Sequence, residues 1–249
     1  MRNPRKTLAA VRSCLTRPRE EIAGTIVSVA TRECAAALTF DDGPHPDYTP
    51  RLLDVLKEHD ARATFFMIGD AAHRQSGLVE RVVAEGHAVG NHTWDHPYLP
   101  STPARERRRQ IRACRRVLAP HGQRLFRPPF GAQSLALCLE AFWLGYRVVN
   151  WNFASRDWLP QEPEGLADRL CQGIRPGSIV LLHDAIYVST QPVPQYNREP
   201  MLAGLGMFLD RIGDRFRFVT VPELLRLGRP CWRAQEQSDE TPTRPQPSV

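Results

Sequence analysis

Residues 35–44 read AAALTFDDGP, an apolar run that ends in two adjacent aspartates and a glycine–proline turn. Ala35 to Phe40 have the character of a buried strand, and Asp41 and Asp42 follow directly at its end. Two neighbouring carboxylates repel each other unless a cation lies beside or between them. The stretch therefore indicates a buried strand that delivers two acidic groups to a cation, although such a run taken alone is also a good turn.

Further apolar runs of strand length follow along the chain, separated by amphipathic segments. Residues 49–59 place their leucines on one helical side, and Thr102 with Pro103 has the signature of a helix start, as N-cap and first helical residue. About seven strands with helices between them predict an α/β fold with a parallel sheet, open or closed into a barrel. The expected strands after the first are residues 63–68, 88–89, 125–126, 146–149, 178–182 and 217–219.

Polar clusters follow five of these expected strands directly. Functional groups behind several different strands are typical of a site at the C-terminal rim of a (β/α) barrel. One such cluster would say little, because each could be a rigid loop or a polar strand cap, but five in order favour the barrel. The clusters are Asp41-Asp42, residues 91–96, residues 127–130, residues 156–158 and His183-Asp184.

The spacing of two histidines in the second cluster points to a metal. His92 and His96 are four residues apart, so in a helical turn their imidazoles would share one face and grip one cation. With one carboxylate from Asp41-Asp42 they make three ligands and leave a fourth position open. That arrangement is typical of catalytic zinc, which lowers the pKa of its bound water to about 7. A histidine pair alone is often a solvated helix face, but its coincidence with the carboxylates favours a metal.

Between Gly24 and Gly228 the chain resembles the polysaccharide deacetylase family, the NodB-homology domain of carbohydrate esterase family 4. The resemblance implies a single domain with a distorted (β/α)7-type barrel. It also implies a divalent metal, usually zinc, with Co²⁺, Ni²⁺ or Mn²⁺ as alternatives, and the removal of acetyl groups from sugars. Five motifs in order carry it: TFDDGP (39–44), HTWDH (92–96), RPPFG (127–131), RDW (156–158) and LLH (181–183).

The resemblance assigns the first half of the site. Asp41 is similar to the family's general base, and Asp42, His92 and His96 are similar to its metal ligands. Arg127 resembles the arginine that orients the base, and a cation beside Asp41 would keep that carboxylate ionised.

The resemblance assigns the second half of the site to later motifs. His183 is similar to the general acid that protonates the leaving amine, held in its charged form by Asp157. The backbone N–H of Phe130 resembles the oxyanion donor, and Trp158 and Leu181 resemble the walls of a small acetyl pocket.

The chain departs from the family pattern at two positions. The fourth motif usually has an aspartate three residues before the matched one, where this chain has Ala154, and the third often has tyrosine in place of Phe130. Because the oxyanion contact comes from the backbone, Phe130 should not abolish activity. Loss of a supporting carboxylate at Ala154 would instead affect the rate or the shape of the pocket. Residues 185–200, with Tyr187, Gln191, Gln195 and Tyr196, read as a long rim loop, either touching substrate or a surface insertion.

Composition sets the frame for this domain. The 249 residues carry a formal net charge of +6, and only Lys6 and Lys57 among the 33 basic residues are lysines. We expect an Arg-rich extension over residues 1–22, one domain over 23–230 and a disordered tail over 231–249.

No apolar run is long enough for a signal peptide or a membrane span, so a cytoplasmic location is expected. Six scattered cysteines without C-x-x-C spacing suggest reduced thiols.

The expected function is metal-dependent removal of N-acetyl groups from N-acetylglucosamine-containing chitooligosaccharides or polysaccharides by an activated water. Two alternatives remain open: deacylation or deformylation of a lipid-linked or small amino sugar, and a barrel that binds glycans without catalysis. Residues 105–116 carry seven arginines, but no aromatic residues interleave to stack bases, so a nucleic-acid partner is not expected. We expect a solvated outer helix there, with Ile111, Cys114 and Leu118 facing inward, and contact with a membrane surface stays open.

Overall fold

The computed structural model of the protein describes residues 22–187 and 196–233. The predicted extension up to residue 21, the tail from residue 234, and Gln191 and Gln195 of the predicted rim loop lie outside the described residues. The strands are β1 Thr25–Ala30, β2 Ala35–Asp41, β3 Ala63–Met67, β4 Ala88–Asn91, β5 Leu125–Phe126, β6 Arg147–Val148, β7 Phe153–Ala154, β8 Ile179–His183, β9 Arg217–Phe218 and β10 Arg229–Arg233. The helices are α3 Tyr48–Glu58, α4 Gly69–Arg74, α5 Ser76–Ala84, α6 Ala104–Leu118, α7 Leu135–Trp143, α8 Pro163–Gly173, α9 Glu199–Ile212 and α10 Val221–Leu224.

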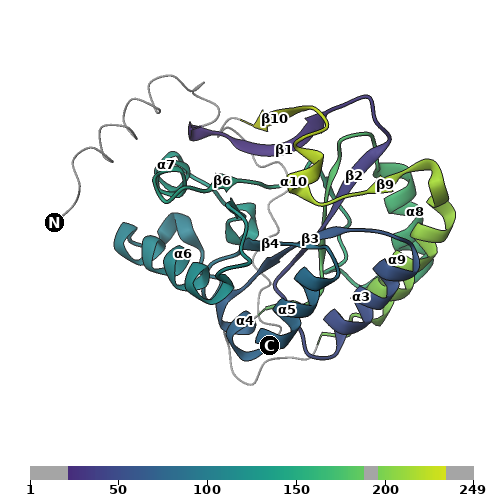
Figure 1. The fold of residues 1–249 in the computed structure, drawn as a ribbon, viewed down its shortest axis with the longest axis horizontal. Helices are drawn as coiled ribbons and strands as arrows, with labels where there is room; N and C mark the ends of the chain where they lie inside the picture. The colour runs from purple at the N-terminus through teal and green to yellow at the C-terminus, as the bar shows by residue number, and fades with distance from the viewer. Residues whose placement is uncertain (1–21, 188–195, 234–249) are drawn as a thin grey trace.

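Eight strands form one sheet in the order β6-β5-β4-β3-β2-β8-β7, with β9 also paired to β2, and every one of these pairings is parallel. The sheet curls, and within the described residues its edge strands β6 and β7 do not pair with each other. The predicted α/β single domain with a distorted barrel is therefore confirmed, as a half-barrel with helices packed around it (Figure 1).

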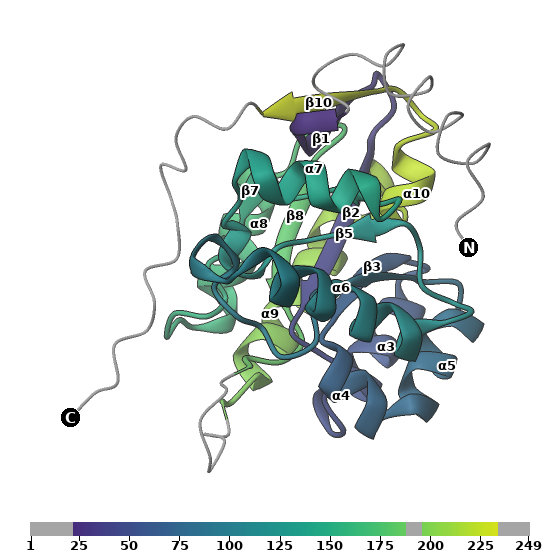
Figure 2. The same ribbon diagram turned by 90° about the vertical axis from the view of Figure 1, so that its left-hand side faces the viewer.

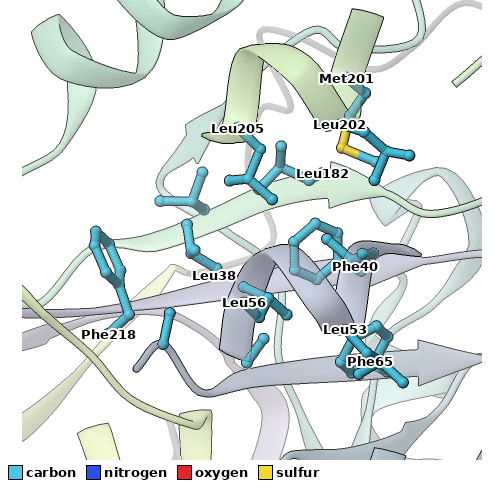
Figure 3. Packing of buried hydrophobic residues seen from close by; sticks show 14 of the residues in the cluster. Leu38, Phe40, Leu53, Leu56, Phe65, Leu182, Met201, Leu202, Leu205 and Phe218 are labelled. Carbon is cyan, nitrogen blue, oxygen red and sulfur yellow. The ribbon is translucent and has the colours of Figure 1, made fainter. Parts of the chain in front are cut away.

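The central strand β2 is buried along its whole length, and its alternation places the catalytic candidates. Leu38 and Phe40 point to the outer side, where they pack with leucines of α3 and α9 in the main core (Figure 3). Ala35 and Ala37 belong to a second core on the inner side. Because successive side chains of a strand point to opposite faces, Asp41 shares the inner face of the curled sheet.

A second, two-stranded sheet joins β1 to β10 in antiparallel fashion and was not predicted. It lies across one end of the half-barrel in both views (Figures 1 and 2). Ser28 of β1 bridges Ser178, just before β8, so this end is the one where the parallel strands begin, opposite to their carboxyl ends. β10 takes in Cys231–Arg233, three residues beyond the predicted end of the domain.

The Arg-rich helix α6 packs beside α7 on one side of the sheet, facing the viewer in Figure 2. Ile111, Cys114 and Leu118 are buried, which confirms the predicted inward face. The helix begins one residue later than predicted, with Pro103 rather than Thr102 as N-cap, because the Thr102 hydroxyl donates back to the Tyr98 carbonyl. No helix in the described part of the chain is both long and apolar enough to cross a membrane.

Candidate active site

The site lies where β2 and β8 end side by side. In this parallel pair Asp41 stands opposite His183, so the predicted base and the predicted acid lie on neighbouring strands in matching register. Both residues end their strands and share the inner face of the sheet. The register of one strand pair thus brings together two residues that are about 140 positions apart in the chain.

A fully buried arginine holds Asp41. Arg127 donates from Nη1 to the Asp41 Oδ1 at 2.7 Å and to the Thr39 hydroxyl at 2.8 Å. Its Nε and Nη2 donate to the backbone carbonyls of Val149 and Asn150. Burial lowers the pKa of Arg127, although Asp41 opposes this shift, and arginine stays charged in proteins. The guanidinium therefore fixes one oxygen of Asp41 and leaves the other directed into the site.

Asp42, His92 and His96 form a tight cluster of potential metal ligands. The Asp42 Oδ1 lies 3.4 Å from the His92 Nε2 and 3.3 Å from the His96 Nε2. Each of the three offers one ligand atom, and all these atoms lie within 4.8 Å of one another. The His92 Nδ1–H donates to the Arg127 carbonyl at 2.8 Å, which leaves its Nε2 lone pair facing the cluster.

The charges around the cluster fit a cation. The Asp42 Oδ1 is buried and has no hydrogen-bond donor among the described residues. Burial would raise the pKa of Asp42, but the imidazoles of His96 and His92 outweigh it and hold the pKa well below its usual range. Burial lowers the pKa of His96 to about 4, so its imidazole is neutral, as a ligand must be. An ionised carboxylate oxygen facing the ring nitrogens of two histidines is therefore a donor set suited to a divalent metal.

The two histidines meet on an irregular loop, so the predicted helical turn is wrong. The loop follows β4, and Thr93 and His96 have positive φ angles of 70° and 59°. The Asn91 Oδ1 accepts from the Thr93 N–H at 3.0 Å. The Gln110 Oε1, on α6, accepts from the N–H groups of Trp94 and Asp95. Side chains of β4 and α6 thus hold the loop in a shape that its own backbone bonds would not maintain.

His183 and Asp157 form a second buried pair beside this cluster. The Asp157 Oδ1 lies 3.0 Å from the His183 Nδ1, and its Oδ2 accepts from the His183 N–H at 2.9 Å. Burial lowers the pKa of His183, but the Asp157 carboxylate raises it more, so the pKa lies above its ordinary value. Asp42 and Asp41 act in the same direction. The ring is therefore held ready to carry a proton.

The three predicted substrate contacts lie beside the ligand cluster, beside His183 or on the same strand as His183. The Phe130 ring lies 4.6 Å from that of His96, and Phe130 has a φ of 60°. The Trp158 ring meets that of His183 edge-on at 5.5 Å, and Leu181 is buried in β8. Ala154 pairs with Leu181 at the start of the fourth motif. The structure therefore brings every predicted site residue to one rim.

Arg198 was not singled out from the sequence, and Asp184 and Gly43 stood in the sequence clusters without an assigned role. Arg198 is buried and donates to the Asp157 carboxylate, but nothing in its spacing from the motifs marks it. Asp184 is fully buried, accepts from the Thr49 hydroxyl, and has its pKa raised to about 7 by burial. A Cβ at Gly43 would lie 2.1 Å from the Asp184 carboxylate, so only glycine fits there. The Tyr187 N–H donates to the Asp42 Oδ2 at 3.0 Å, which supports the idea that the rim loop reaches the site.

Comparison with known proteins gives consistent results. A family model described as polysaccharide deacetylase matches residues 28–149. A chitooligosaccharide deacetylase of Azorhizobium caulinodans is 38% identical over 168 residues, covering 66% of this chain and 80% of the relative. A peptidoglycan-N-acetylglucosamine deacetylase of Bacillus cereus is 36% identical over 203 residues, covering 80% of this chain and 91% of the relative.

The structural comparison agrees. The crystal structure of the Bc1960 peptidoglycan N-acetylglucosamine deacetylase superimposes with a TM-score of 0.73 at 30% sequence identity. The match covers 82% of this chain and 94% of that chain.

Proposed function

Because the chain belongs to the polysaccharide deacetylase family, we propose that it is a metal-dependent hydrolase that removes N-acetyl groups from N-acetylglucosamine residues in an oligo- or polysaccharide. One observation carries the proposal: a buried carboxylate, a cluster of three ligand atoms and a His–Asp pair meet at one rim. Relatives named for chitooligosaccharide and for peptidoglycan share this chemistry, since both substrates contain N-acetylglucosamine.

Asp42, His92 and His96 would hold the divalent metal, and zinc fits this ligand set with an open position best. When bound, the metal supplies a Lewis acid that polarises the acetyl carbonyl and makes water a nucleophile at neutral pH. The chain provides the proton acceptor. The Asp41 Oδ1 is held by Arg127, so its Oδ2, 3.8 Å from the His92 Nε2, is the oxygen that takes the proton from the attacking water.

The proton donor is His183. Its Nδ1–H donates to Asp157, which leaves the opposite nitrogen, Nε2, to protonate the leaving amine. We propose that the Phe130 N–H binds the developing oxyanion and that Trp158 and Leu181 enclose the acetyl methyl group. A pocket that fits only an acetyl group would disfavour longer acyl groups by about 1–3 kcal/mol for each additional methylene.

We expect the purified protein to release acetate from short chitooligosaccharides and to lose this activity after treatment with a chelator. Zinc added back should restore most of the lost rate, because the ligand residues are built into the fold. Acetate is measured by a coupled enzymatic assay, and circular dichroism is recorded before and after chelation to show that the fold is kept.

Release that survives complete metal removal would contradict metal dependence. No release with any divalent ion from a folded protein would contradict the choice of substrate. Peptidoglycan fragments and N-formyl or lipid-linked amino sugars are then assayed in the same way. Inactivity on all of these would leave glycan binding without catalysis as the function.

The pKa of His183 gives a pH-dependent prediction. A general acid must be protonated, so kcat/KM should fall as the pH rises through the pKa of His183, which Asp157 raises above about 6.5. Asp157→Asn removes the negative charge that raises the pKa of His183. The falling limb of the plot of kcat/KM against pH should therefore move to lower pH. The control is Asp168→Asn, which removes an exposed carboxylate paired with Arg211 and should leave the limb in place. An unmoved limb in Asp157→Asn would show that His183 is not the titrating acid.

A further inference from the structure

Arg198 is a buried arginine immediately before α9, and it reaches back to the fourth and fifth motifs. Its Nη1 donates to the Asp157 carbonyl at 2.8 Å, and its Nη2 donates to the His183 carbonyl at 2.9 Å. Nη2 also donates to the Asp157 Oδ2. One side chain thus binds the backbone and the carboxylate of Asp157 together with the backbone of His183. Arg198 is only 4% exposed, so water does not compete strongly for these bonds.

The Asp157 carboxylate depends on this contact because it is completely enclosed. Its Oδ1 accepts from the Ser155 hydroxyl at 2.8 Å and faces the His183 Nδ1. Its Oδ2 accepts from the His183 N–H and from Arg198. An ionised carboxylate removed from water needs paired charge and a full set of donors. Arg198 is the permanent charge in this set, whereas the charge of His183 changes when it gives up its proton.

The pairing follows a pattern repeated across the site. Arg127 and Arg198 each hold a buried carboxylate that we assign to proton transfer, Asp41 and Asp157. In both cases the guanidinium also donates to backbone carbonyls, so it fixes the position of the strand ends as well as the charge. Lysine could supply the charge, but its single ammonium cannot reproduce the planar fork that spans separate acceptors.

We propose that Arg198 is a positioning residue for proton donation: it fixes Asp157 and the His183 backbone relative to each other, so that the imidazole keeps its Nδ1 on Asp157 and its Nε2 toward the leaving group. The proposal rests on the proposed function, in which His183 is the acid. Through Arg198, the residue before α9 is bonded directly to the His183–Asp157 pair.

The test compares two substrates that differ in their need for an acid. Departure of an amine from a chitooligosaccharide requires a proton, whereas 4-nitrophenolate leaves 4-nitrophenyl acetate without one. We expect Arg198→Met to lower kcat on the oligosaccharide about 10- to 100-fold, with KM nearly unchanged. Hydrolysis of 4-nitrophenyl acetate should change less than about threefold. Arg198→Lys should fall between the wild type and Arg198→Met, because the charge is kept and the fork is lost.

Arg51→Met is the matched control. Arg51 forms an exposed ion pair with Glu199, the residue next to Arg198, so its loss should leave both activities unchanged. Equal loss on both substrates in Arg198→Met, or no loss on the oligosaccharide, would overturn the proposal. If Arg198→Met does not fold, Arg198→Lys is used instead. The proposal is overturned if this variant has the wild-type ratio of oligosaccharide activity to 4-nitrophenyl acetate activity.

A spectroscopic measurement separates this inference from the proposed function. In protein labelled with 15N-histidine, the His183 Nδ1–H proton bonded to Asp157 should give a downfield resonance, assigned by its absence in His183→Gln. We expect Arg198→Met to broaden or shift this signal and Arg51→Met to keep it. An unchanged signal in Arg198→Met overturns the positioning role. A wild type inactive on the oligosaccharide, with the signal responding as expected, overturns only the choice of substrate.

Discussion

Asp41→Asn is expected to lower kcat for acetate release by about 10²- to 10⁴-fold, the usual contribution of a general base. Asparagine has nearly the same shape and can still accept a hydrogen bond from Arg127, but it cannot take a proton. Because Asp41 is the neighbour of a ligand rather than a ligand in our proposal, the variant should still bind one zinc ion. The measurements are steady-state kinetics on a chitooligosaccharide and metal content by atomic spectrometry.

Asp54→Asn provides the comparison, since Asp54 is an exposed carboxylate paired with Arg81 on the outer helices. Its activity should equal that of the wild type. If Asp41→Asn kept more than a tenth of the wild-type kcat with zinc bound, Asp41 would not be the proton acceptor. Loss of zinc together with loss of activity would instead place Asp41 among the ligands.

Arg127→Met is expected to destabilise the fold by about 3–5 kcal/mol, because it leaves the Asp41 carboxylate buried without its cation. The Arg127 side chain is fully buried, and its guanidinium also packs 4.1 Å from the centre of the Phe66 ring. Methionine would keep part of the packing and none of the hydrogen bonds. The free energy of unfolding is measured by urea denaturation of protein saturated with metal.

The double variant Asp41→Asn with Arg127→Met tests whether the unpaired Asp41 carboxylate causes the loss of stability. If the unpaired Asp41 charge is responsible, the double variant should be less destabilised than the sum of the single variants, since neither charge of this pair remains. Arg211→Met, which breaks an exposed pair with Asp168, should change stability by no more than about 1 kcal/mol. A loss in Arg127→Met as small as this control would show that Asp41 finds another partner or becomes protonated.

The sequence predicted which residues gather at the rim because a parallel sheet brings the ends of its strands to one edge. Asp41 and His183 end two adjacent strands, so the position of each motif after an apolar run was enough to place them together. The four-residue spacing of His92 and His96 predicted correctly that their side chains meet, but the helical turn on which that prediction rested is absent. Their loop depends on left-handed residues and on Gln110, which lies 14 residues after His96 on α6, and no local pattern shows such support.

Arg198 could not be predicted for a related reason. It lies 41 residues from Asp157 in a chain rich in arginine, and only the tertiary structure separates it from the many arginines on the surface. β1 and β10 were missed because a pairing between distant strands leaves no local signal. The two-residue strand β7 was also not predicted, because two residues cannot show alternation and no separate apolar run marks this strand between residues 149 and 156.

The pairing of β1 with β10 has a consequence for synthesis of the protein. Thr25 pairs with Arg233, so β1 leaves the ribosome about 200 residues before its partner strand. At about 5–20 residues per second, that interval lasts roughly 10–40 seconds. Throughout this time the β1 edge that later pairs with β10 is open to any other extended segment. Completion of the domain therefore waits for the last described strand, and a nascent chain stalled before residue 229 would expose an edge that can nucleate aggregation.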